Sequence, residues 1–332
     1  MQTLRLKADE AGVAQAADLL RRGGLVAFPT ETVYGLGANA LDRIAVTKIF
    51  EAKQRPTWDP IIVHGASLED LRSLVLEWPE HAETLARVYM PGPLTLLLPK
   101  KDIVPSECTA GRDKVGVRIP SHEVAKSLIR AAGIPIAAPS ANRFGHTSPT
   151  TAEHVLADLD GRIDAVLDGG ATDVGVESTV IDVTITPPVI YRPGGITREM
   201  IESVIGPVTI AQRPLTDLPI ESLESPGLGI RHYAPRAKLV LVHGREEFLA
   251  ASASARDKRL GLMLPEGWDA AELKDAKKFA WGDIEDLEQL AHNLYEGLRT
   301  LDEQKVEIIV CPIPRADGVG LAILDRLTKA AK

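Results

Sequence analysis

The feature that most constrains the fold is a stretch without hydrophobic periodicity, from Gln212 to Pro235. It carries closely spaced prolines and glycines, namely Pro214, Pro219, Pro226, Gly227, Gly229 and Pro235. Such density indicates an extended connection, and ordered connections of this length are often functional. The chain of 332 residues also exceeds the size at which one hydrophobic core usually stops growing. We therefore expect two domains, residues 1–211 and 237–332, joined by a linker of residues 212–236.

The first part alternates between helical patterns and short apolar segments. Residues 11–22 and 121–132 have helical spacing, and Ser67 is typical of an N-cap. The expected strands are Leu25 to Phe28, Ile61 to Val63, Leu94 to Leu98, Val115 to Ile119, Ile134 to Ala138, Ala165 to Leu167, Val180 to Val183 and Val189 to Tyr191. Because the alternation is irregular, the sequence predicts a twisted, mixed and open α/β sheet rather than strict βαβ repetition.

The second part has a more regular pattern. Strands are expected at residues 238–242, 260–264 and 306–310, and helices at residues 284–298 and 321–331. This predicts a smaller, Rossmann-like α/β domain.

Composition excludes several classes of protein. Two cysteines in different halves allow neither a disulfide framework nor a CxxC motif, and no apolar run is long enough to cross a bilayer. Residues 1–210 contain 21 basic and 26 acidic side chains, and residues 211–332 contain 17 and 20. Neither part therefore has the basic excess of a dedicated nucleic-acid binder. The N-terminus lacks an apolar signal region, so we expect a cytoplasmic protein. None of the eight histidines pairs at the i, i+4 spacing of a zinc helix, so we expect no structural metal.

Two segments near the N-terminus combine polar side chains with turn-forming residues. Phe28 to Gly37 reads FPTETVYGLG, which suits a binding loop as well as an ordinary turn, and it lacks the Walker A signature. Lys53 and Arg55, in KQRP, end a helical pattern. These two cations could complement the helix dipole or clamp phosphate groups, and the sequence alone leaves both open.

Further polar residues follow apolar strands. Ser140 and Asn142 come directly after residues 134–138, and strand ends in open α/β sheets are common ligand sites. Ser148 precedes a possible helix, where hydroxyl and backbone N–H groups can bind phosphate. Arg118 interrupts an apolar strand and so requires an anionic partner, either a structural carboxylate or that of a ligand.

Taken in order, these segments resemble the YrdC-like threonylcarbamoyl-AMP synthases in their long form with an appended C-terminal domain. The resemblance rests on FPTETVYGLG (28–37), KQRP (53–56), PGPLTLLLP (91–99), TAGRDKVGVRIP (109–120), APSAN (138–142), SPT (148–150), GVESTV (175–180), RPGG (192–195), SPGLGIRHYAP (225–235) and GVGLAILDRL (318–327). Each motif is short, but the ordered set covers nearly the whole chain and is specific.

The resemblance implies an enzyme, a nucleotidyltransferase that makes threonylcarbamoyl-AMP from L-threonine, bicarbonate and ATP for tRNA modification. It assigns Lys53 and Arg55 to catalysis and implies an ATP site built from Lys53, Arg55, Thr57, Thr109, Ser140, Asn142, Ser148, Arg192 and Tyr233. It implies a threonine site built from Thr30, His64, Arg118 and Ser178. Mg²⁺ is expected to enter with ATP rather than through protein ligands.

The resemblance also implies partners and has limits. A threonylcarbamoyl transferase of the Kae/Tsa type is expected to take the labile product, with weak or indirect contact to tRNA and none to membranes. Asp59, Leu228 and Ile230 depart from residues common in the family. Two rivals stay open, namely a carbamoyltransferase of hydrogenase maturation, which needs more cysteines, and a non-catalytic RNA-binding or ribosome-assembly module.

The linker adds a last hypothesis. Its glycines permit close approach, its prolines stiffen the path, and His232 and Tyr233 supply polar aromatic groups. We expect it to act as a lid that excludes water from the nucleotide, although it could also serve only as a spacer.

Overall fold

A computed structural model describes residues 2–211 and 232–332 of the chain. The described residues form two compact units. The first comprises residues 2–144, 149–173 and 177–211, and the second comprises residues 145–148, 174–176 and 232–332. The predicted linker falls largely on residues 212–231, outside the described residues, and the predicted domain boundaries stay a prediction.

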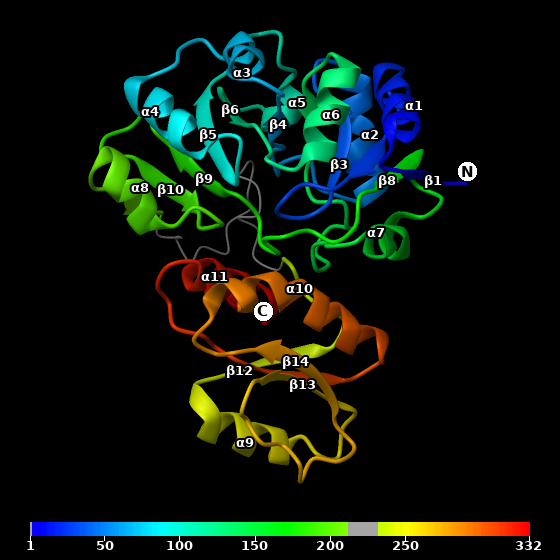
Figure 1. Cartoon of the computed structure of the whole chain (residues 1–332), viewed down its shortest axis with the longest axis vertical. Helices are drawn as coiled ribbons and strands as arrows, with labels where there is room; N and C mark the ends of the chain where they lie inside the picture. Colours follow the sequence, from blue (N-terminus) through cyan, green and yellow to red (C-terminus); the bar gives the residue numbers. More distant parts are fainter. Residues whose placement is uncertain (1, 212–231) are drawn as a thin grey trace. The chain divides into compact units, whose positions relative to one another are not determined.

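The first unit is built on one mixed sheet of 11 strands (Figure 1). In sheet order the strands are β1 (Leu4–Lys7), β8 (Ala165–Asp168), β2 (Val26–Phe28), β3 (Gly35–Asn39), β7 (Ile136–Ala137), β4 (Val63–His64), β6 (Lys114–Arg118), β5 (Leu94–Pro99), β9 (Thr179–Asp182), β10 (Val189–Arg192) and β11 (Thr209–Ile210). Parallel and antiparallel pairs alternate irregularly along the sheet. For example, β4 and β6 are parallel, whereas β5 and β6 are antiparallel. The predicted mixed α/β sheet is confirmed.

Helices cover both faces of this sheet. They are α1 (Glu10–Arg21), α2 (Arg43–Lys53), α3 (Leu68–Leu74), α4 (Glu80–Tyr89), α5 (Ser106–Thr109), α6 (Glu123–Ala132), α7 (Ala152–Leu159) and α8 (Arg198–Ile205). Strand β2 shows the two faces, because Val26 and Phe28 pack with α1 and α6 while Ala27 belongs to the core that includes α2. Side chains of a strand alternate between faces, so three consecutive apolar residues fill two cores.

Local sequence explains several helix ends. Ser67 caps α3 in a capping box with Asp70, as its spacing predicts. Helix α2 begins after the N-cap Asp42 and ends at Lys53, where Gln54 takes a left-handed conformation. The expected helix at 121–132 begins later, since His122 is the N-cap of α6. The FPTETVYGLG segment is also not one loop, because its last residues form β3 against β2 and leave residues 29–34 as the connection.

The second unit contains a parallel sheet of four strands, consistent with the expected Rossmann-like pattern. In sheet order these are β12 (Lys238–Val242), β15 (Ile308–Pro312), β13 (Leu260–Pro265) and β14 (Lys277–Gly282). Its helices are α9 (Gly244–Ser254), α10 (Leu287–Glu303) and α11 (Gly320–Ala330). Across the described residues of both units, every helix is too short or too polar to span a bilayer.

Candidate functional site

One edge of the large sheet gathers polar side chains from five neighbouring strands, β4, β6, β5, β9 and β10. His64 and Arg118 are the last residues of β4 and β6 and lie opposite each other in this parallel pair. Thr95 lies near the start of β5, which runs antiparallel to β6, and Ser178 directly precedes β9. Arg192 ends β10, which runs antiparallel to β9. The alternating strand directions therefore bring all five residues to the same edge.

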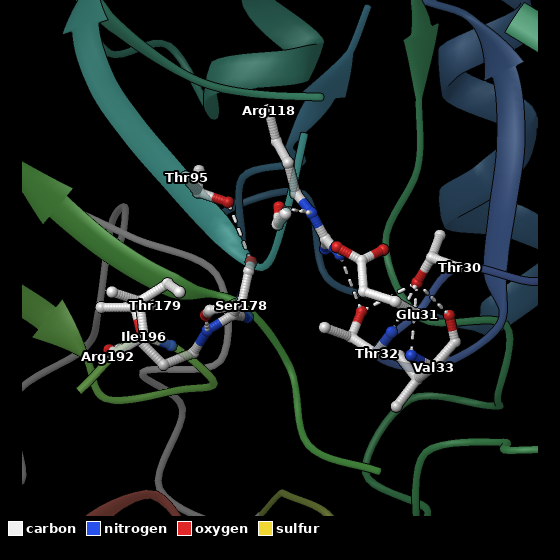
Figure 2. A network of polar contacts seen from close by, with 11 residues as sticks. Thr30, Glu31, Thr32, Val33, Thr95, Arg118, Ser178, Thr179, Arg192 and Ile196 are labelled. Carbon is white, nitrogen blue, oxygen red and sulfur yellow. Dashed lines mark hydrogen bonds and ion pairs between the residues drawn. The ribbon is translucent and has the colours of Figure 1, made fainter. Parts of the chain in front are cut away.

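Arg118 is buried and held by groups of the connection between β2 and β3 (Figure 2). Its Nη2 lies 2.9 Å from Oε1 of Glu31 and donates to Oγ1 of Thr32 at 3.1 Å. Its Nε donates to the main-chain oxygen of Gly92 at 3.2 Å. The anionic partner that the sequence required is thus a structural carboxylate, Glu31, in the protein as described.

Thr30 shapes this connection. Its hydroxyl lies 2.8 Å from the hydroxyl of Thr32, donates to the main-chain oxygen of Val33 at 2.7 Å and accepts from the main-chain N–H of Thr32. Hydroxyl side chains commonly fold turns through bonds of this kind. Thr30 therefore fixes the loop from which Glu31 and Thr32 face Arg118 (Figure 2).

His64 is a neutral group beside this cation. Burial, together with the nearby charge of Arg118, lowers its pKa from 6.5 to about 3. Its Nδ1 has no hydrogen-bond partner among the described residues. A neutral imidazole with a spare ring nitrogen can accept from, or donate to, a polar group of a ligand.

Ser178 connects the β5 and β10 side chains. Its hydroxyl lies 2.8 Å from the hydroxyl of Thr95, and Arg192 Nη2 donates to Ser178 Oγ at 3.1 Å and to its main-chain oxygen at 3.0 Å. The structure therefore joins Ser178, predicted for threonine, with Arg192, predicted for ATP (Figure 2). Both side chains are buried.

Lys53 forms the centre of a second polar group. It is 1% exposed, and its ammonium donates to the main-chain oxygens of Ser140, at 2.6 Å, and Asn142. Ser140 in turn contacts Asn142 through their side chains at 2.6 Å. Burial, with a contribution from the charge of Arg55, holds the pKa of Lys53 well below its usual range. The two predicted motifs KQRP and PSAN are thereby brought together.

Arg55 belongs to the same group and is neutralised by Asp59. Its Nη2 lies 2.9 Å from Oδ2 of Asp59, and it donates to the main-chain oxygens of Asp59 and Pro60 at 3.2 and 2.8 Å. Asp59 is fully buried. Asp59 therefore places a negative charge directly beside Arg55.

The connection between β2 and β3 reaches both groups. Glu31 and Thr32 contact Arg118, whereas the main-chain oxygen of Tyr34 accepts from the N–H of Ala141 at 2.8 Å, inside the PSAN segment. One short loop thus adjoins both polar groups. The Arg118 group comprises Arg118, Thr30, Glu31, Thr32, His64 and Ser178, and the Lys53 group comprises Lys53, Arg55, Asp59, Ser140 and Asn142.

The other predicted residues are placed less closely. Thr57 is exposed in the turn after α2, and Thr109 is buried at the end of α5, where its hydroxyl donates to Ser106 O at 3.3 Å. Among the described residues, no hydrogen bond or ion pair joins Thr57 or Thr109 to the polar groups around Arg118 and Lys53.

Ser148 and Tyr233 belong to the second unit. Arg299 Nε donates to the main-chain oxygen of Ser148 at 3.3 Å. Tyr233 is 1% exposed, has a left-handed φ of 64°, and its ring lies 5.2 Å from the Arg326 guanidinium. Leu228 and Ile230, and most of the proposed lid, lie outside the described residues.

Three functional candidates were missed from the sequence. Glu31, Thr32 and Thr95 contact predicted site residues directly. Glu31 could have been singled out, because a carboxylate in a segment of apolar and hydroxyl residues needs a cation once buried, as Arg118 does. Thr95 gave no comparable signal, since threonine is common in strands.

No three histidine, cysteine, aspartate or glutamate side chains converge as a metal site in the portions of the chain that the structure describes. The two groups instead offer buried cations, hydroxyls and two carboxylates, Glu31 and Asp59.

Two family models match successive parts of the chain. One, described as "Telomere recombination" for the Sua5/YciO/YrdC domain, matches residues 18–194. The other, described as the C-terminal domain of threonylcarbamoyl-AMP synthase, matches residues 196–332.

Known relatives match over almost the full length. The chain is 46% identical to the threonylcarbamoyl-AMP synthase of Pyrococcus abyssi, covering 99% of this chain and 96% of the relative, and 47% identical to that of Bacillus subtilis, covering 99% and 95%. A crystal structure of P. abyssi Sua5 complexed with L-threonine superposes with a TM-score of 0.92 at 45% identity, covering 100% of this chain and 98% of that chain.

The fold and the polar edge of the sheet therefore define a two-unit α/β protein of the Sua5/YrdC type. The chain belongs to the threonylcarbamoyl-AMP synthase family, as its motifs indicated.

Proposed function

We propose that the chain makes threonylcarbamoyl-AMP and pyrophosphate from L-threonine, bicarbonate or CO2, and ATP. The observation that carries the proposal is the likeness over the whole chain to P. abyssi Sua5, whose structure is described as complexed with L-threonine. The polar edge of the sheet supports it, because it holds a cation, a carboxylate and hydroxyls of the kinds that an amino acid needs. The product would serve tRNA modification.

The Arg118 group is the proposed threonine site. Arg118 would bind the substrate carboxylate, as charge-assisted pairs with guanidinium are strong and directional. Ser178, Thr30 and the neutral His64 would contact the hydroxyl and amine, with Thr32 supporting them. All of these side chains are buried, so water is largely excluded around the amine.

The Lys53 group is the proposed triphosphate site. Lys53 and Arg55 would act on the charge that develops at the reacting phosphate. The residues that the family resemblance further assigns to ATP are Thr57, Thr109, Ser140, Asn142, Ser148, Arg192 and Tyr233. Lys53 donates to two main-chain carbonyl oxygens, and the carboxylates of Asp158 and Asp59 act on its charge from further away.

The chemistry needs no nucleophilic side chain. The neutral threonine amine attacks the carbon of CO2 and loses one proton to become a carbamate. With bicarbonate as the carbon source, that proton and a hydroxide leave together as water. The carbamate carboxylate then attacks the α-phosphorus of ATP, forming the mixed anhydride and expelling pyrophosphate. Alignment and charge neutralisation are what the second step requires. When bound with ATP, Mg²⁺ would neutralise phosphate charge, and its ligands would be mainly phosphate oxygens and water.

Radiolabelled bicarbonate tests this function. We expect the full chain, with ATP, magnesium and L-threonine, to form labelled threonylcarbamoyl-AMP and equimolar pyrophosphate. Omission of any one substrate should abolish both. Rapid pyrophosphate release with threonine under strictly CO2-free conditions would contradict the order of steps.

The product is a labile mixed anhydride, so a transferase must consume it soon after release. A threonylcarbamoyl transferase of the Kae/Tsa type is the proposed recipient, with tRNA contact weak or indirect and both proteins in the cytoplasm. Adding such a transferase and tRNA to the labelled reaction should move the label into tRNA.

A further inference from the structure

Glu31 is a buried carboxylate whose hydrogen-bonding capacity is largely unused. It is 4% exposed, and its side chain turns toward Arg118 (Figure 2). Oε1 lies 2.9 Å from Arg118 Nη2, yet Oε2 has no hydrogen-bond partner among the described residues. Buried polar atoms are usually satisfied, and an exception calls for an explanation. A ligand that donates hydrogen bonds to Oε2 would supply one.

Charge balance indicates which ligand this is. Together Glu31 and Arg118 are neutral, and the described ion pairs give neither of them another charged partner. A simple carboxylate entering the site would add an uncompensated buried negative charge, and a simple amine would add a positive one. Both are costly in a desolvated site. A zwitterion adds no net charge, because its carboxylate can pair with Arg118 while its ammonium pairs with Glu31.

We propose that Glu31 receives the ammonium group of the substrate and makes the site select an α-amino acid over the corresponding 2-hydroxy acid. This rests on the proposed function, since it assigns a role within the same threonine site. Glu31 is then a specificity-determining residue. Its ion pair with Arg118 keeps both charges compensated before the substrate enters.

A purely structural role for Glu31 makes a different prediction. If Glu31 only neutralised Arg118, its removal would free the guanidinium and strengthen the binding of any small carboxylate, whether amino acid or hydroxy acid. Under our proposal the two ligands respond in opposite directions. The amino acid loses its ammonium partner, whereas the hydroxy acid gains a site whose charge it now balances.

Calorimetric titration of the full chain, without ATP, distinguishes these roles. The ligands are L-threonine and the 2,3-dihydroxybutanoate that differs from it only by a hydroxyl in place of the amine. We expect Glu31→Gln to weaken threonine binding about 10- to 100-fold, the range for a hydrogen bond to a charged group, and to strengthen dihydroxybutanoate binding. Glu31→Asp should restore part of the preference for threonine.

Asp182→Asn is the matched control, since Asp182 is another buried carboxylate of the first unit with a cationic partner, Lys114. It should leave the ratio of the two affinities unchanged. If Glu31→Gln also leaves that ratio unchanged, the proposal is wrong. If the unchanged chain itself fails to bind threonine, the proposed function fails instead. Thermal unfolding of each variant identifies any that do not fold, and Glu31→Asp then decides alone.

Discussion

The two polar groups of the first unit both bury cations, but they compensate them differently. Lys53 donates to main-chain oxygens of Ser140 and Asn142, and Arg55 is paired with the buried Asp59 and with nearby carbonyls. Arg118 instead faces a carboxylate with an unused oxygen, next to hydroxyls and a neutral histidine. The hydrogen bonds of the first group hold main-chain segments in place. In the second group, a small ligand can take over part of the contact between Arg118 and Glu31.

This difference indicates a division of labour. Main-chain oxygens cannot move away without a change in the loop that carries them, so Lys53 is held rigidly where phosphate charge would develop. Arg55 is held in the same way by the main-chain oxygens of Asp59 and Pro60, in addition to the Asp59 carboxylate. A side-chain carboxylate can rotate or share its cation, so the Arg118 group can accept a zwitterion. Substitutions in the two groups should therefore affect different kinetic parameters.

The largest effect is expected for Lys53→Ala. The rate of pyrophosphate release at saturating substrates should fall about 100- to 1000-fold, since loss of one such electrostatic contact costs that much in other enzymes. Measurement of kcat and of both KM values tests this.

Lys48→Ala is the control for that experiment. Lys48 lies on the same helix α2 and also donates to a main-chain oxygen, that of Gly23, at 2.7 Å. It lies outside both polar groups, and its substitution should leave kcat within about twofold of the original. An equal loss of rate in both variants would show that Lys53 acts only through the fold.

Arg118→Ala should act on threonine. We expect the KM for threonine to rise about 10- to 100-fold, as for loss of a hydrogen bond between charged groups, with the KM for ATP nearly unchanged. The variant also leaves Glu31 without its cation, so its unfolding temperature should fall. Arg118→Gln keeps hydrogen-bond donors but has no charge, and its unfolding temperature should fall as well. If Arg118→Ala changes the KM for ATP instead of that for threonine, the proposed distinction between the two groups is wrong.

The neutral state of His64 gives a pH prediction. Its pKa is lowered from 6.5 to about 3 in the folded protein. At a pH between these two values, His64 is therefore protonated in the unfolded chain but not in the folded protein. Its contribution to stability is complete above pH 6.5 and is lost progressively as the pH falls toward 3. From neutral pH to about pH 5 this amounts to about 2 kcal/mol.

Denaturant unfolding at both pH values measures it. The acid loss of stability should shrink by that amount in His64→Gln, whereas the exposed His81→Gln should behave like the unchanged protein. Identical acid losses in the two variants would mean that His64 is not buried as a neutral group.

The smallest effect is expected for Asp59→Asn, which removes the charge opposite Arg55. ATP binding should strengthen by a few-fold, since Arg55 would retain more of its charge for phosphate, while threonine binding stays the same. Titration with a non-hydrolysable ATP analogue is the measurement, and weaker nucleotide binding would argue that Asp59 mainly orients Arg55.

Much of this picture could be predicted from the sequence, and the exceptions have physical causes. Arg118 was singled out because it interrupts an apolar strand and Ser178 because it directly precedes one, and the sheet brings both to one edge. Strand β3 was missed because its sequence, GLGAN, has glycines in place of the alternating apolar and polar side chains that are typical of a strand. Strand β14 (KKFAWG) was missed for a similar reason, since its lysines are exposed at the edge of the second sheet.

Partners were harder to predict than positions. That Arg118 needs an anion followed from its apolar surroundings, but that Glu31 supplies it depends on how residues 29–34 fold over β6. Asp59 was recognised as unusual, yet its pairing with Arg55 depends on the turn after α2. Both contacts are set by loop conformation rather than by periodicity, which is the signal that sequence patterns carry best.

Threonine affinity measured without ATP, for Lys53→Ala beside Arg118→Ala, tests the division of labour most directly. The account predicts that Lys53→Ala binds threonine within about threefold of the unchanged protein, while Arg118→Ala binds it at least about 10-fold more weakly. Equal losses of threonine affinity in the two variants would contradict it.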